Sequence, residues 1–449
     1  MYRMPFLCNY VTPCGGPTGS TALNDLVDCA TNYGNGTVIV GQQIGAIATG
    51  NSNTAVGYSA LEVNTTDSNT AVGNLALRSN TTGAQNVAMG FEALASNIGG
   101  TNNVAMGPGA LVSNTRGDEN VAVGYRALAI NMIGRENVAV GPGALRNNIA
   151  DTNIAVGSNA LTSNATGAQN VAMGYEALSS NTTGANNVAM GYEALASNMG
   201  GTNNVAMGFE ALYRNTAANN TAVGYRALAG GTTGDYNVCI GYGAGFGVAG
   251  NQIQTGSKSV CIGSLTTVAG TADTNEIVIG YGAPGGGGDS VTLGNASIQT
   301  IRGQVAFTIY SDIRIKKNIE DSDLGLEFIS RLRPVKYNRV NPAEYPAELL
   351  EKRFQGDNPD EKPEDDPKIY HGLIAQEVKQ TLDDIGKTWD GHSISASDGK
   401  QGITYGGLVM PLVNAVKELD ARNITLEKEN SELKERLDSL EERLNKAGL

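Results

Sequence analysis

The octapeptide Val171-Ala172-Met173-Gly174-Tyr175-Glu176-Ala177-Leu178 is one copy of a unit that recurs, with variations, a dozen times in this chain of 449 residues. Aligned on its glycine, the unit returns every 16 or 17 residues. This spacing is too regular for an ordinary globular domain and too short for a helical-pair or propeller repeat, which leaves a solenoid or a fibre. The aligned glycines are Gly57, Gly73, Gly90, Gly107, Gly124, Gly141, Gly157, Gly174, Gly191, Gly208, Gly224 and Gly241.

The order of residues within the unit predicts how one coil is built. A small residue stands two positions before the glycine and Val, Met or Ile one position before it, an alternation that indicates a short strand. The glycine then ends the strand, where a side chain would collide or the backbone must turn. The following Glu-Ala-Leu-Ala-Ser-Asn segment favours a helical turn that ends with its asparagine in the left-handed conformation.

An asparagine stands four residues before each glycine, and we expect these side chains to form an inward ladder between parallel strands. One coil would advance the rod by roughly 4.8 Å, so twelve coils would extend about 55–60 Å. Because the interior residues are small, a lone coil buries little apolar area, and association of three chains is the expected remedy. The asparagines are Asn53, Asn69, Asn86, Asn103, Asn120, Asn137, Asn153, Asn170, Asn187, Asn204, Asn220 and Asn237.

This pattern resembles the head-domain repeats of trimeric autotransporter adhesins and the related fibre repeats of phage tail proteins, in which a Val-Ala-Ile-Gly core recurs. The match covers roughly Asn53 to Ala244. The resemblance implies a trimeric parallel β-roll, although the unit here is longer than the usual family unit, which leaves the coil shape and handedness open.

Composition divides the chain into two parts and excludes several classes of function. The net charge of −13 splits into −6 for residues 1–310 and −7 for residues 311–449, so neither part offers a basic surface for nucleic acid. The first residues lack the apolar core of a signal peptide, and no stretch approaches the ~20 apolar residues that span a bilayer. We therefore expect no membrane span, whereas a bacterial autotransporter needs an export signal and an anchor.

The five cysteines indicate neither a disulfide framework nor a metal site. Cys239 and Cys261 occupy the small-residue position of Val-Cys-Ile-Gly units and are expected to be buried apolar residues. Cys8, Cys14 and Cys29 fit no zinc signature, and we interpret them as free thiols of a protein assembled in a reducing cytoplasm. The surrounding residues 1–50 would be an attachment segment or a cap over the first coil.

The chain changes character at Ser311. Ser311-Asp312-Ile313-Arg314-Ile315-Lys316-Lys317-Asn318-Ile319 is followed by Leu332-Arg333-Pro334-Val335-Lys336-Tyr337 and by His371-Gly372-Leu373-Ile374-Ala375-Gln376-Glu377-Val378. In isolation, Ser-Asp would indicate a helix cap and the basic cluster a solvated face. The constellation as a whole resembles the C-terminal intramolecular chaperone domain of phage endosialidases, tailspikes and neck appendages, also found in myelin regulatory factor.

The resemblance implies a domain that drives trimerisation of the preceding fibre and then cuts the chain between Tyr310 and Ser311. It assigns Ser311 as the nucleophile and Lys316 as the general base. A lysine accepts a proton only when it is neutral, which requires burial or a nearby cation such as Arg314.

Supporting roles around this pair stay open. Backbone amides or Asn318 could stabilise the oxyanion, and Asp312 adjoins the nucleophile. His371 matches a region that the family uses near its site, but a structural histidine is an equal alternative.

The last forty residues carry a heptad pattern of apolar residues with flanking charges, which predicts a coiled coil. Its two core asparagines lower stability but fix the register, and the family resemblance favours three strands. One core position holds Leu412, Leu419, Leu426, Leu433 and Leu440, and the other holds Val416, Asn423, Asn430, Leu437 and Leu444.

The sequence thus predicts a mainly β protein, a repetitive parallel β-solenoid followed by a small α+β domain and a coiled coil. The predicted divisions are 1–50 (attachment or cap), 51–245 (solenoid), 246–310 (irregular β region), 311–407 (self-cleaving chaperone) and 408–449 (trimeric coiled coil).

The expected function is a phage or prophage tail fibre, a homotrimer assembled in the host cytoplasm and located in the virion. We expect it to join tail or baseplate proteins through its N-terminus and to bind an unknown glycan or protein receptor, without a cofactor or metal. The alternative is a bacterial trimeric surface adhesin without its own membrane anchor. A glycan-degrading spike is disfavoured because the repeats offer no carboxylate pair in a separate catalytic domain.

Overall fold

A computed structural model describes residues 31–32, 36–41, 50–246, 253–295, 297–298, 300–302, 304, 311–341, 344–346, 367–394 and 399–447. Most of the predicted N-terminal segment, with Cys8, Cys14 and Cys29, lies outside these residues, as does Tyr310. No helix in these ranges is long and apolar enough to cross a membrane.

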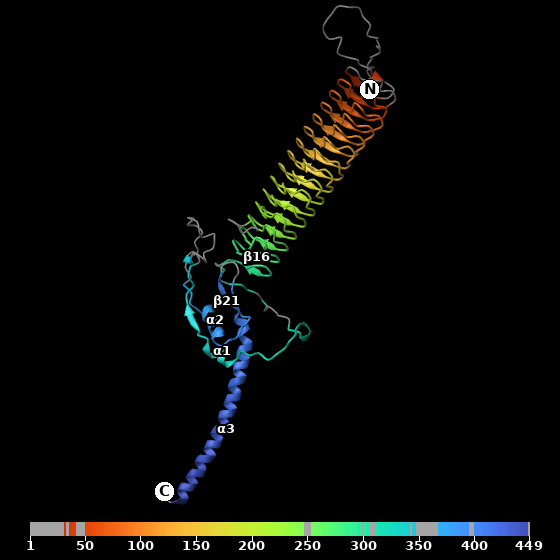
Figure 1. Ribbon diagram of the computed structural model, residues 1–449. Helices are drawn as coiled ribbons and strands as arrows, with labels where there is room; N and C mark the ends of the chain where they lie inside the picture. The colour runs from red at the N-terminus through yellow and green to blue at the C-terminus, as the bar shows by residue number, and fades with distance from the viewer. Residues whose placement is uncertain are drawn as a thin grey trace, which may run out of the picture. The chain divides into compact units, whose positions relative to one another are not determined.

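The repeats form a parallel β-solenoid of about 14 turns, which confirms the predicted fold class (Figure 1). Strands of three residues stack in register, so that Ala172 pairs with Ala155 on one side and Ala189 on the other. Up to Gly200 the strands are β1 (Thr31–Asn32), β2 (Thr37–Val40), β3 (Thr54–Val56), β4 (Thr70–Val72), β5 (Val87–Met89), β6 (Val104–Met106), β7 (Val121–Val123), β8 (Val138–Val140), β9 (Ile154–Val156), β10 (Val171–Met173) and β11 (Val188–Met190).

From Gly201 onward the same ladder pattern continues through six further strands. Cys239 pairs with Cys261, and both thiols are buried, as the sequence predicts. The pKa of the Cys239 thiol is raised by its hydrogen bond to Cys261 and by burial, so this thiol stays protonated. The strands are β12 (Val205–Met207), β13 (Thr221–Val223), β14 (Val238–Ile240), β15 (Val260–Ile262), β16 (Ile277–Ile279) and β17 (Val291–Leu293).

The interior of each coil contains alanine, leucine and the predicted asparagine ladder. In a typical coil Ala105, Ala110 and Leu111 are fully buried. Asn103 is also fully buried, and its side-chain oxygen accepts hydrogen bonds from the backbone N–H and the side-chain Nδ2 of Asn120, both at 3.0 Å. The ladder therefore satisfies backbone groups that the small apolar core leaves without water.

The strand-ending glycine is required for both reasons that the sequence suggests, namely a backbone that must turn and a side chain that would collide. Gly107 has a φ of +134°, and a Cβ there would lie 2.7 Å from the carbonyl oxygen of Gly124 on the next coil. Any side chain would push adjacent coils apart.

The predicted helical turn after the glycine is wrong. Residues 91–96 form a series of turns in which Glu92 (φ 58°) and Leu94 (φ 52°) adopt the left-handed conformation. The backbone N–H of Leu94 instead donates to Ala110 on the next coil at 3.0 Å. Hydrogen bonds between coils thus override the local helical preference of the Glu-Ala-Leu sequence.

The asparagine at the end of this segment is not a left-handed cap but belongs to a second buried ladder. Asn97 donates from Nδ2 to Asn80 Oδ1 at 2.7 Å and to the carbonyl of Gly100 at 2.9 Å. The members, all fully buried, are Asn64, Asn80, Asn97, Asn114, Asn131, Asn148, Asn164, Asn181, Asn198 and Asn215.

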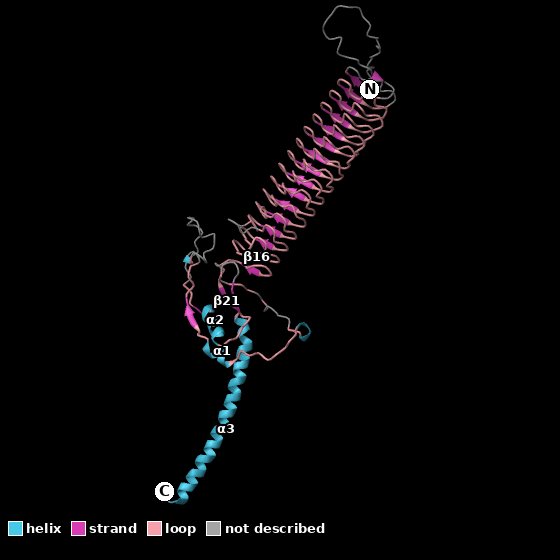
Figure 2. Cartoon of the chain, in the orientation of Figure 1, coloured by secondary structure: helices cyan, strands magenta, loops and turns pink. Residues whose placement is uncertain are grey.

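The C-terminal region is a small α+β unit followed by a long helix (Figure 2). Its core contains Leu324, Phe328, Val378 and Leu382, against which Trp389 packs. The elements are η1 (Ile313–Ile315), α1 (Leu326–Arg331), β18 (Val335–Tyr337), β19 (Tyr370–Gly372), α2 (Ala375–Asp384), β20 (His392–Ile394), β21 (Gln401–Ile403), η5 (Tyr405–Leu408) and α3 (Val409–Ala447).

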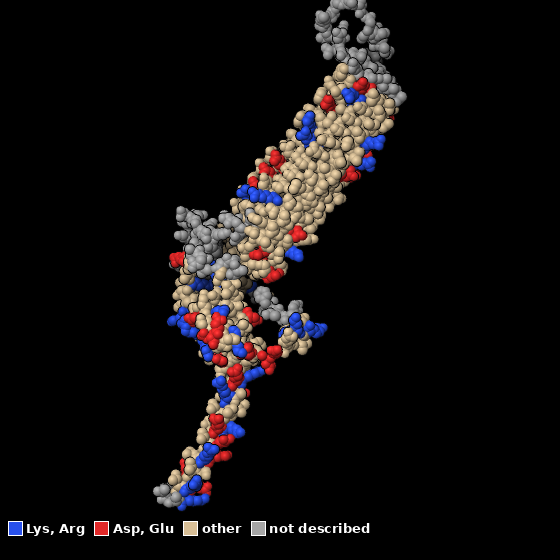
Figure 3. Space-filling model, viewed as in Figure 1, with Lys and Arg blue, Asp and Glu red and all other residues tan. Residues whose placement is uncertain are grey.

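Charge is distributed unevenly between these regions. Figure 3 shows acidic and basic side chains crowded over the C-terminal unit and α3, while the visible face of the solenoid is largely uncharged. On the solenoid, the residues directly before the glycine leave apolar surface exposed, including Met89 (41%), Met106 (40%) and Met173 (40%). Apolar surface repeated on every coil is a feature of an association face.

Candidate self-processing site

Ser311 and Lys316 flank the short helix η1, which brings their side chains together. Asp312 caps η1 by accepting a hydrogen bond from the Arg314 N–H at 2.8 Å, and Lys316 is the residue that ends it. Lys316 Nζ donates to Ser311 Oγ at 2.7 Å. The five-residue separation therefore becomes a direct contact between a hydroxyl and an amine, the arrangement in which an amine can take the proton of a nucleophile.

Asp312 forms an ion pair with Arg314, with Oδ2 and Nη2 2.5 Å apart. The hydrogen bonds from Arg314 hold the pKa of Asp312 below its ordinary value, and the carboxylate raises the pKa of Arg314. Asp312 thus shapes the turn that carries Ser311, while much of the positive charge of Arg314 is balanced locally.

The structure does not bring the other two candidates to Ser311. Asn318 is exposed with a left-handed backbone (φ 53°), and His371 lies on β19 opposite Lys336 of β18. Among the described residues, neither side chain forms a hydrogen bond with Ser311. The roles suggested for Asn318 and His371 stay predictions.

Both members of the serine–lysine contact are exposed to solvent in a single chain. The apolar seam of α3 is exposed as well, with Leu419 at 46%, Leu426 at 53% and Leu433 at 59%. A helix that displays a leucine every seventh residue to water needs partner helices.

Residues 311–387 match the family model described as Chaperone of endosialidase. The match begins at Ser311, the residue assigned as nucleophile, and it supports a C-terminus that assembles trimers and processes itself. No curated protein matches the chain. A β-solenoid followed by a chaperone-of-endosialidase domain fits a tail-fibre-like protein with a C-terminal chaperone domain.

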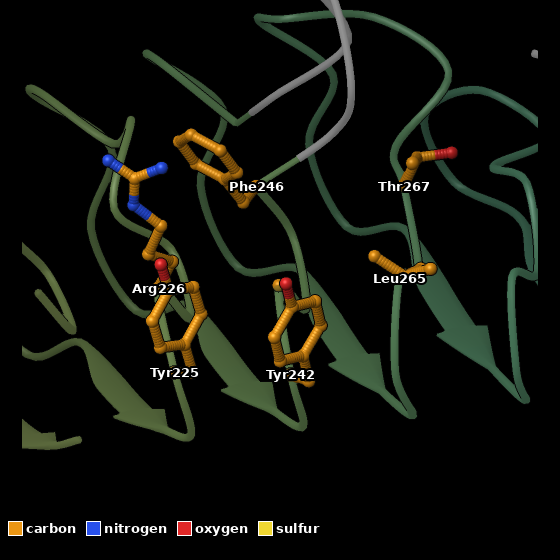
Figure 4. Close-up of a pocket in the computed structure, with 7 residues that line it drawn as sticks. Tyr225, Arg226, Tyr242, Phe246, Leu265 and Thr267 are labelled. Atoms are coloured by element: carbon orange, nitrogen blue, oxygen red, sulfur yellow. The ribbon is translucent and has the colours of Figure 1, made fainter. Parts of the chain in front are cut away.

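The sequence reasoning missed a group of surface residues on the solenoid. Tyr225, Arg226, Tyr242 and Phe246 line a hollow in coils that otherwise repeat the common unit (Figure 4). The available signal was a spacing of 22 residues between Gly241 and Gly263, where every earlier step is 16 or 17.

Proposed function

We propose that this protein is a phage or prophage tail fibre whose C-terminal domain assembles the homotrimer and then removes itself by cutting between Tyr310 and Ser311. The contact between Lys316 Nζ and Ser311 Oγ at 2.7 Å carries the proposal for the cut. The solenoid serves as the shaft that reaches the host surface, and the released fibre belongs to the virion after assembly in the host cytoplasm.

The proposed reaction is a hydrolysis in two steps. Ser311 Oγ attacks the carbonyl carbon of Tyr310 while Lys316, in its neutral form, takes the hydroxyl proton. The C–N bond between Tyr310 and Ser311 then breaks, the new amino group of Ser311 receives that proton, and an ester joins the two residues. Water hydrolyses the ester, which frees the Tyr310 carboxylate and restores the Ser311 hydroxyl.

Assembly would gate this reaction because Ser311 and Lys316 are exposed in one chain. Packing of three chains would remove water from the pair and favour the neutral amine. A cut that waits for the trimer cannot release the chaperone before the shaft has formed.

The test is intact-mass analysis of the expressed full chain. Two fragments that meet at Tyr310 and Ser311 are expected, while Ser311→Ala and Lys316→Ala should leave the chain whole. Lys317→Ala is the matched control, because it removes an adjacent lysine that does not contact Ser311, and it should still be cut. Efficient cutting of Ser311→Ala would refute the mechanism.

Gating is tested separately by dilution of uncut precursor through its dissociation range. The fraction cut per unit time should fall as monomers accumulate. A first-order rate that persists among monomers would show that assembly does not control the cut.

A further inference from the structure

The hollow on the solenoid surface has a volume of about 190 Å³ and is lined by residues of successive coils (Figure 4). The rings of Tyr225 and Tyr242 are stacked, with their centroids 5.0 Å apart and their planes within 8° of parallel. Phe246 and Arg226 lie beyond them, and Leu265 and Thr267 belong to the next coil. Drug-sized ligands occupy about 300–1,000 Å³, so this hollow fits one small ring.

The chemistry of the lining is that of a carbohydrate subsite. Tyr225 is stacked between Phe209 and Tyr242, whereas Tyr242 ends this stack and is 56% exposed, so the C–H face of a pyranose ring can lie on its other face. Arg226 and Thr267 add donors and an acceptor at the edge, where sugar hydroxyl groups would reach them.

Arg226 indicates that the sugar is neutral. Its Nε donates to Glu210 Oε2 at 2.6 Å, and its guanidinium lies 5.5 Å from the centre of the Phe246 ring. Glu210 balances the positive charge and would repel an incoming carboxylate or sulfate. The pair still offers free donor and acceptor positions to uncharged hydroxyl groups.

A second hollow of about 270 Å³ adjoins the first, and Arg226 and Phe246 line both. Its remaining lining includes Glu210, Tyr213 and Arg214, which are polar. Two hollows on either side of one shared wall favour a ligand of at least two linked units over a single ring.

The coils that carry the hollow depart from the regular repeat, and a coil with a purely structural role would not need this departure. Strands β14 and β15 pair in register although 22 residues separate Val238 from Val260. The sequence Gly-Tyr-Arg-Ala-Leu-Ala occurs both at 224–229 and at 124–129, but Tyr125 is followed on the next coil by Pro142 and not by a tyrosine. Of these two copies only the later has an aromatic partner on the next coil, as Tyr175 has in Tyr192. The departure from the regular pattern is the 22-residue step, and such departures are expected at functional sites.

We propose that the hollow formed by Tyr225, Tyr242, Arg226 and Phe246 binds a neutral glycan, with one pyranose ring against Tyr242 and a second unit beyond Arg226. This inference rests on the proposed host-attachment function and names its ligand class. It leaves the self-cleavage reaction untouched.

The test uses the mature trimeric shaft, purified after it has cleaved itself. Saturation-transfer NMR and calorimetry would follow binding of glucose, galactose, mannose, N-acetylglucosamine, lactose and chitobiose, with digalacturonic acid as the acidic probe. A neutral disaccharide should bind more tightly than its monosaccharides. Tyr242→Ala and Arg226→Gln should each weaken binding about tenfold or more, whereas Tyr242→Phe keeps the stacking face and should stay within about threefold.

Arg126→Gln and Tyr125→Ala are the matched controls, because they alter the same sequence where no second tyrosine follows. Arg126 lies 5.5 Å from the Tyr125 ring, close to the 5.9 Å between Arg226 and Tyr225. Both control variants should bind as the parent does. Intact mass and sedimentation confirm that every variant is cleaved and trimeric, which separates lost binding from misfolding.

Three results would overturn the inference: no binding of any neutral sugar at millimolar concentration, binding of digalacturonic acid alone, or equal losses in the control variants. Absence of binding would include the case in which another copy of the chain covers the hollow. Normal cleavage alongside absent binding refutes the glycan site and leaves the proposed self-processing standing. Binding by a shaft that is never found in virions would refute the tail-fibre assignment instead.

Discussion

Replacement of Asn103 by alanine should destabilise the shaft far more than the small number of atoms removed would suggest. The Asn103 side chain donates to the Gly117 carbonyl at 2.8 Å and to Asn86 Oδ1 at 3.2 Å. Its oxygen accepts from the backbone N–H and Nδ2 of Asn120, both at 3.0 Å. Asn103→Ala removes all four hydrogen bonds, and the buried N–H of Asn120 loses the acceptor that the ladder provides.

The magnitude follows from these contacts. An orphaned buried donor costs about 1–3 kcal/mol, and each of the other three hydrogen bonds contributes about 0.5–1.5 kcal/mol. Together they amount to about 2.5–7.5 kcal/mol per chain, a large part of the about 5–15 kcal/mol that stabilises a typical domain.

The assay is hydrogen exchange of the cleaved shaft combined with its guanidinium unfolding midpoint. Asn103→Ala should lower the midpoint and expose the Asn120 amide and the amides of adjacent coils. Asn102→Gly is the control, because Asn102 is exposed with a φ of 58° that glycine adopts readily, and its effect should stay within about 1 kcal/mol. Equal midpoints for the two variants, with the Asn120 amide still protected, would refute the ladder argument.

Three further predictions concern the packing of coils, a buried carboxyl group and the helical seam. Gly107→Ala should abolish soluble shaft, checked by fractionation of expressed protein, because its Cβ would meet the next coil at 2.7 Å. Burial raises the pKa of Glu276, so the folded state keeps a proton that the unfolded chain has lost. The thermal midpoint should therefore fall as pH rises through the raised pKa. Glu276→Gln should flatten that fall, because it removes the titrating group. Aspartate at both Leu426 and Leu433 should give uncut, aggregated shaft in sedimentation, because buried charges cost several kcal/mol, whereas Ser431→Asp on the same helix should still assemble.

The sequence predicts the parts of the coil that repeat and are governed by size. A strand with alanine inside and a glycine at its end follows directly from the 16- or 17-residue unit, and Ala172 and Gly107 occupy those positions. The turn after the glycine could not be predicted in this way. Left-handed φ at Leu94 costs roughly 1–2 kcal/mol, and it is stabilised by a hydrogen bond to a coil 16 residues away that local propensities ignore.

The second asparagine ladder was misjudged for a related reason. Asparagine at the end of an apolar segment is a common left-handed cap, and one unit alone gives no reason to prefer another role. The second ladder exists only because coils stack, since Asn97 Nδ2 donates to Oδ1 of Asn80, the equivalent asparagine of the preceding coil. The same limit applies to the candidate site: the family resemblance assigned Ser311 and Lys316, but only the geometry of η1 shows that their side chains meet.

The order of assembly follows from where the hydrogen bonds of each region lie. In the solenoid most of the backbone hydrogen bonds join residues of neighbouring coils, so the first coil must close several loops before any neighbour supports it. Helix α3, with hydrogen bonds between residues four apart, forms without that cost, and its exposed leucines give chains a means to associate early. A shaft that nucleates slowly thus gains most from a domain that aligns chains first. Once coils are stacked, that domain is no longer needed, because the coils then support one another and unfolding is limited by its barrier. The proposed removal of the chaperone after assembly would therefore cost the shaft nothing and would make the process irreversible, which is a physical reason to join an assembly domain and a self-processing site in one segment.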